Sequence, residues 1–153
     1  MRKGAVALSG ALGLILLAAA PPPTSVGRGQ RAHSSHAQSI NAEARLHYLH
    51  TSGSTLVEEG PVTGSLHGHA HADLTASATF NGSFTFYTSQ GEIKGHGTAQ
   101  PHGSGRYESF SGHDVITGGT GRYAHAHAHG TMYGTYDRVT YNVTIQTRGT
   151  LYY

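Results

Sequence analysis

The feature that most constrains the fold is a strict alternation of side-chain types at the end of the chain. Between Val139 and Tyr153, valine, tyrosine and isoleucine alternate with threonine, asparagine, glutamine and arginine. Residues two apart on a β-strand point to the same face, so this pattern predicts one half-buried strand of about fifteen residues. At about 3.3 Å per residue it would reach roughly 50 Å, and it must therefore coil strongly, as the strands of barrels do.

Further short alternating segments fill the chain from about residue 46 onward. The clearest runs from Val62 to Leu74. Hairpin turns are predicted at Asn81-Gly82 and Gln90-Gly91, and a loop at 101–105. No segment carries a helical stripe, so we expect an all-β fold of seven or eight antiparallel strands, either a closed barrel or a sandwich. Many small residues on one face favour the single antiparallel β-barrel, because they permit tight curvature and closure removes exposed edges.

Composition excludes several classes of protein. Glycine accounts for 22 of 153 residues and charged residues for only 12%. There are 10 Lys plus Arg against 8 Asp plus Glu, and Arg2 and Lys3 lie in a segment expected to be removed, which leaves a neutral chain. A nucleic-acid partner is therefore not expected. The absence of cysteine excludes disulfides, thiolate metal sites and a cysteine nucleophile.

The N-terminal segment has the pattern of an export signal. A basic start precedes an apolar run from Ala5 to Ala20, which is shorter than the roughly twenty residues of a membrane span. We predict a signal peptide over residues 1–27, a flexible lead-in over 28–43 and one barrel domain over 44–153. The protein would then be secreted and would keep no membrane span after processing; the alternative is a retained N-terminal anchor.

The 13 histidines all follow residue 32, and six of them form two runs. On a strand, His67, His69 and His71 would share one face, about 6.6 Å apart. Neighbouring imidazoles of this kind could share a Zn²⁺ or Cu²⁺ ion, or simply form a solvated polar face. In the second run, His125 and His129 would lie one turn apart on the same face if the segment were helical. If the segment were a strand, His127 would share that face with them. No cofactor is required by the sequence, and Zn or Cu is the one it suggests.

Adjacent pairs of titratable residues do not form an acid-base site in the sequence. Glu58 lies beside Glu59, and His113 beside Asp114. Neighbouring residues on a strand point to opposite faces, so neither pair can act together. We assign no catalytic residue, and whether the protein is an enzyme stays open.

The segment I-T-G-G-T-G-R-Y-A at 116–124 resembles a signature of the allene oxide cyclase and dirigent barrel superfamily. Gly118, Gly119, Gly121 and Tyr123 occupy the places of its Gly-Gly-x-Gly turn and following aromatic residue. The stretch 91–153 also resembles small secreted bacterial proteins classed with that barrel. The resemblance implies a barrel used as a shaped cavity: the cyclases convert a fatty-acid epoxide, and dirigent proteins orient phenoxy radicals.

These observations predict a binding or stereochemical-guide cavity for a small apolar or aromatic ligand. The first alternative is an extracellular histidine-rich protein that binds metal or responds to pH. The second is an isomerase similar to allene oxide cyclase, which rests on fold analogy alone. Homo-oligomerisation is left open.

Overall fold

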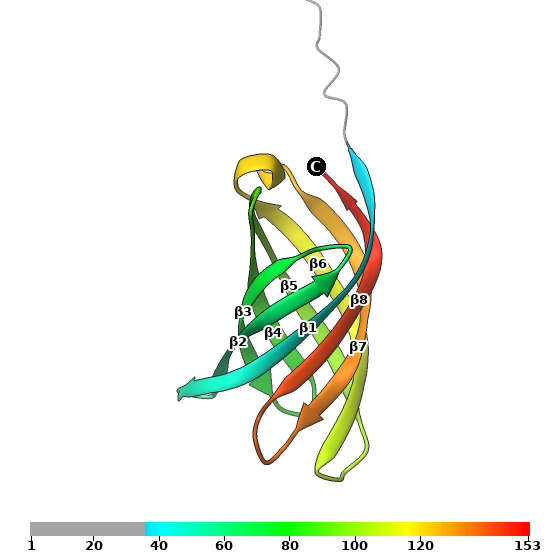
Figure 1. Ribbon diagram of the computed structural model, residues 1–153. Coiled ribbons are helices and arrows are strands. Elements are labelled where there is room, and N and C mark those ends of the chain that lie inside the picture. The colour runs from blue at the N-terminus through cyan, green and yellow to red at the C-terminus, as the bar shows by residue number, and fades with distance from the viewer. Residues whose placement is uncertain (1–35) are drawn as a thin grey trace, which may run out of the picture. The chain divides into compact units, whose positions relative to one another are not determined.

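The computed structural model describes residues 36–153, which fold into eight strands and one short 3-10 helix (Figure 1). The elements are β1 (Ala37–Ser52), β2 (Thr55–Gly64), β3 (Gly68–Ala76), β4 (Phe80–Thr88), β5 (Gly91–His102), β6 (Tyr107–Gly119), η1 (Gly121–Tyr123), β7 (His127–Asp137) and β8 (Val143–Tyr152). The expectation of an all-β fold with seven or eight antiparallel strands is confirmed.

The strands form a closed barrel in which each pairs with its neighbours in sequence and β8 returns to β1. All eight pairings are antiparallel. A path of directly paired residues that leaves β1 at Gln38 and passes once around the barrel returns to β1 at Tyr48. This offset requires strands steeply tilted to the barrel axis, and Figure 1 shows β1 and β8 crossing the barrel obliquely.

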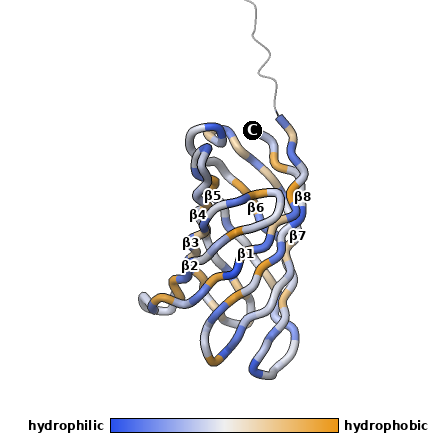
Figure 2. Tube along the Cα trace, in the orientation of Figure 1, coloured by the Kyte–Doolittle hydropathy of each residue, from blue (hydrophilic) through white to orange (hydrophobic). Residues whose placement is uncertain are grey.

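The alternation along each strand divides an apolar interior from a polar exterior. Figure 2 shows apolar and polar positions following one another along the tube. The most deeply buried apolar side chains are Leu151 and Ile93, at 0% and 1% exposure. Each buried aliphatic or aromatic side chain contributes roughly 1.5–3 kcal/mol, which stabilises the sheet without disulfides.

Glycines allow the barrel to coil and to fill. At Gly60 and Gly112 an added Cβ would collide with a carbonyl oxygen of the neighbouring strand, from Arg45 and Thr98 respectively. Elsewhere a lumen side chain lies over a glycine: the ring of Phe84 is 2.6 Å from where a Cβ of Gly95 would stand. The high glycine content therefore reflects close backbone approach and the packing of large side chains into the space that glycine leaves.

Several expected boundaries differ from the structure. β1 begins at Ala37, within the predicted lead-in 28–43, because Ile40 and Ala42 pack into the core. β8 begins only at Val143, since Asp137 accepts hydrogen bonds from two backbone N–H groups in the turn before it. The run 62–74 is broken by a turn at 65–67, which divides β2 from β3.

Of the two predicted hairpin turns, one is wrong. Asn81 and Gly82 lie inside β4, and the chain turns instead at 77–79, where the Ser77 hydroxyl donates to the Thr79 carbonyl. The turn at 89–90, beside Gly91, is confirmed.

The signal peptide predicted for residues 1–27 lies outside the described residues. Within residues 36–153, no helix has the length and apolar character needed to span a membrane.

Candidate ligand cavity

Two cavities lie one after the other inside the barrel. The larger cavity has a volume of about 120 Å³, and its walls come from all eight strands. The smaller cavity has a volume of about 60 Å³. Leu74, Met132 and Ile145 belong to the walls of both cavities and separate them. Since methionine is flexible, movement of Met132 would join the two volumes.

The larger cavity is almost entirely apolar. Small and branched aliphatic side chains form most of its wall, with Phe84 and Phe86 on one side. Its polar side chains deep in the barrel are those of Asp114 and Thr147. The Thr147 hydroxyl donates a 2.7 Å hydrogen bond to Oδ2 of Asp114, whereas Oδ1 of Asp114 is buried without a partner.

A second carboxyl group is buried in the barrel. Glu58 is fully buried in β2, where it lies opposite Tyr48 of β1 and Ala72 of β3 in the strand register. Neither of its carboxyl oxygens has a hydrogen-bond partner. Burial raises the pKa of Glu58 from its usual 4.5 to about 8. The group is therefore protonated and neutral at pH 7.

Aromatic side chains narrow both ends of the barrel. Figure 1 shows a short helical turn at the end of the barrel where the chain's C-terminus lies. The buried Tyr123 of this turn, η1, packs edge-on against Tyr153, with ring centroids 5.2 Å apart. At the other end, Phe80 packs edge-on against both Phe110 and Tyr136. The buried Glu108 at this end is paired, because Arg138 donates two hydrogen bonds to it.

The glycine-rich turn forms the connection between β6 and β7. Gly121 adopts φ +58°, a left-handed conformation that favours glycine, and a Cβ there would meet the Gln90 carbonyl. Arg122 donates hydrogen bonds to the Gln90 side chain and the Tyr153 hydroxyl. Gly118 and Gly119 end β6. The turn therefore positions Tyr123 at the end of the barrel.

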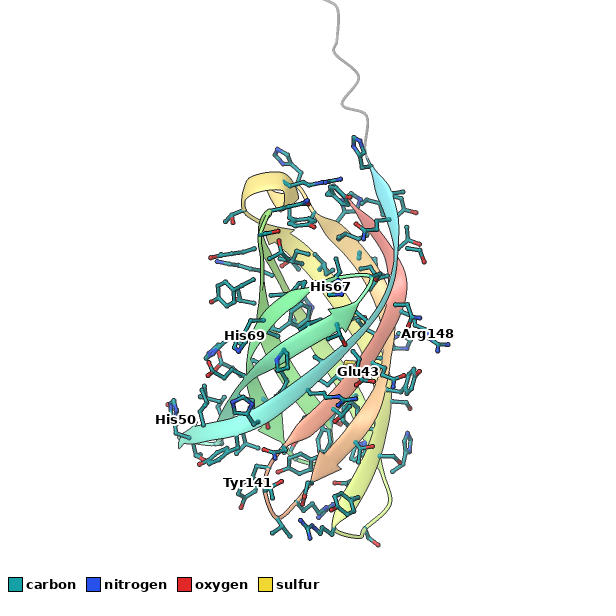
Figure 3. All side chains as sticks on the ribbon, viewed as in Figure 1. Glu43, His50, His67, His69, Tyr141 and Arg148 are labelled. Carbon is teal, nitrogen blue, oxygen red and sulfur yellow. The ribbon has the colours of Figure 1, made fainter. Side chains whose placement is uncertain are left out.

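The histidine runs lie on the outside of the barrel. His67 is in the turn before β3 and is exposed, as is His69, and His71 lies 3.8 Å from Asp73 (Figure 3). His125 precedes β7 and His129 lies within it, both exposed. Across residues 36–153 no three side chains of the types that bind metal ions come together. Zn or Cu binding by these histidines stays a prediction.

No known protein family, curated protein or solved structure matches this chain. The site must therefore be interpreted from its own geometry.

The sequence pattern did not indicate that Glu58 and Asp114 lie inside the barrel. It placed Glu58 and Glu59, and His113 and Asp114, on opposite faces, and the structure has Glu58 and Asp114 inside with their neighbours outside. The sequence does contain a signal for this, because residues two apart on a strand share a face. Asp114 is two residues from the buried Ile116, and Glu58 is two residues from the buried Leu56. Alternation assigns a face, but it does not indicate that a carboxylate lies beside a cavity.

Proposed function

We propose that this protein is a secreted β-barrel that binds one small apolar or aromatic molecule in its lumen. The observation that carries the proposal is the larger cavity, with apolar walls contributed by every strand. Ligand sites are typically concave and mostly apolar, with a few placed polar groups, and Asp114 with Thr147 provides such a group here. The turn at Gly118–Tyr123 and the closed barrel support the proposed relationship to the allene oxide cyclase and dirigent barrels.

The volume restricts the size of the ligand. An apolar cavity of about 150 Å³ is enough to hold benzene or xenon. The larger cavity alone, at about 120 Å³, is somewhat smaller than this, but movement of Met132 would join it to the 60 Å³ cavity and give room for one ring with a short substituent. A long acyl chain would not fit, which favours a binding protein over the fatty-acid isomerase alternative.

Titration with toluene, followed by the NMR shifts of backbone amides, tests this function. We expect saturable shifts at Ala72 and Ile116, which line the larger cavity. Ala72→Leu fills the cavity and should weaken toluene binding at least about tenfold. Ala78→Leu makes the same change in an exposed turn and should leave binding unaltered. Failure of toluene to saturate the folded wild-type protein would refute a ligand cavity of this kind.

The histidine-rich exterior supports a second candidate function, in metal binding or pH response. Every histidine in residues 36–153 is at least partly exposed, so its imidazole is available to solvent ions and protons. Calorimetric titration with Zn²⁺ and Cu²⁺ tests metal binding. Dissociation constants tighter than millimolar that are lost in His69→Ala or His71→Ala would support it, and weaker binding would remove it.

A further inference from the structure

Asp114 places a carboxylate in the wall of an otherwise apolar cavity. Its side chain lines the larger cavity beside Thr147, which donates to Oδ2 and so fixes the orientation of the carboxyl group. Oδ1 is buried and has no hydrogen-bond partner. A buried carboxylate oxygen without a hydrogen-bond partner is costly, and residues 36–153 supply no donor to it, so the Asp114 carboxyl group as a whole would gain from a donor that a ligand brings.

Within residues 36–153, no basic side chain forms an ion pair with this carboxylate. The walls of both lumen cavities contain no lysine, arginine or histidine side chain. None of the ion pairs in residues 36–153 involves Asp114, although Asp137 and Glu108 are each paired with an arginine. Asp114 is therefore an acidic side chain in a cavity wall that contains no basic one, which favours a cationic ligand and disfavours an anionic one.

The strand beside Asp114 is shaped to receive its carboxyl group. Gly130 is paired directly with Asp114, and a Cβ at Gly130 would overlap Oδ1. Because Gly130 has no side chain, the Asp114 carboxyl group can lie against the backbone of β7. The arrangement is a ring-sized apolar volume with one oriented acidic group at its edge.

We propose that the natural ligand is a small aromatic or aliphatic amine, whose ammonium group pairs with Asp114 while its apolar body fills the larger cavity. This inference rests on the proposed ligand-binding function and specifies the ligand class. Charge-assisted hydrogen bonds from N–H to a carboxylate are about twice as strong as neutral ones, and more so away from water. Affinity for the amine should therefore exceed affinity for its apolar counterpart.

Calorimetry at pH 7 and low salt, with benzylamine, benzoate and toluene as probes, tests the inference. We expect benzylamine to bind at least about tenfold more tightly than toluene, and benzoate more weakly than either. Asp114→Asn keeps the size of the side chain and removes its charge, and should reduce the preference for benzylamine to less than about twofold without weakening toluene binding. Thr147→Val, which leaves Oδ2 without its donor, should give an intermediate preference.

Glu58→Gln is the matched control, because it changes a second buried carboxyl group that lines neither cavity. It should leave the preference for benzylamine unchanged, and circular dichroism verifies that each variant is folded. Toluene binding without a preference for benzylamine, or a preference that survives Asp114→Asn, would overturn the amine inference alone. Absence of binding by every probe would overturn the ligand-binding function as well.

Discussion

Glu58 is a fully buried carboxyl group whose raised pKa couples the stability of the barrel to pH. Its pKa rises from 4.5 to about 8 on burial, so between these values the folded chain holds a proton that the unfolded chain releases. The free energy of unfolding should therefore fall as pH rises from about 4.5 to 8, by up to about 1.4 kcal/mol per pH unit from this residue. Tyr136, the nearby titratable group, has its own pKa raised and does not titrate in this range.

Urea unfolding at pH 5, 6.5 and 8 measures this dependence. Glu58→Gln, which cannot ionise, should flatten the slope and make the protein more stable than the wild type at pH 8. Glu59→Gln makes the same change on the outer face of β2 and should preserve the slope. Equal slopes in the wild type and Glu58→Gln would show that Glu58 does not carry the pH dependence.

At the level of the strands, glycine positions govern how tightly the sheet coils. A Cβ at Gly112 would meet the Thr98 carbonyl of β5, which cannot move without breaking the ladder. A Cβ at Gly97 would instead meet Cε of Met132 at 2.8 Å, the end of a flexible side chain. We expect Gly112→Ala to destabilise the protein by at least about 2 kcal/mol and Gly97→Ala by less than about 1 kcal/mol, measured by urea unfolding. Similar losses for both would contradict this steric account.

The strands also show where sequence patterns suffice and where they fail. Alternation identifies the core face of β8, because Val143 and Leu151 are buried as it predicts. It does not locate the start of β8, because Val139 continues the pattern in a turn that the Asp137 carboxylate holds together. Likewise Asn81-Gly82 has the composition of a turn, but Gly82 pairs with Leu74 and Gly97 on either side. Ladder pairing with distant strands outweighs local turn preference there.

For the whole molecule, the closed barrel follows from small residues, alternation and the need to protect edges, but the cavity does not. Its volume depends on how side chains from eight strands meet, for example Phe84 over Gly95 and Met132 over Gly97. These side-chain contacts depend on the register between neighbouring strands, which no short segment of the sequence specifies by itself. The proposed function therefore depends on an apolar volume in the lumen that can hold one small molecule.

A crystal structure of the protein under xenon pressure tests that claim most directly, since xenon enters apolar cavities of about this size. We expect a xenon atom in the larger cavity, among Leu46, Phe86 and Ile116. In an Ala72→Leu crystal treated in the same way, that atom should be lost. A lumen filled by side chains, or a wild-type crystal in which xenon binds only outside the barrel, would contradict the account.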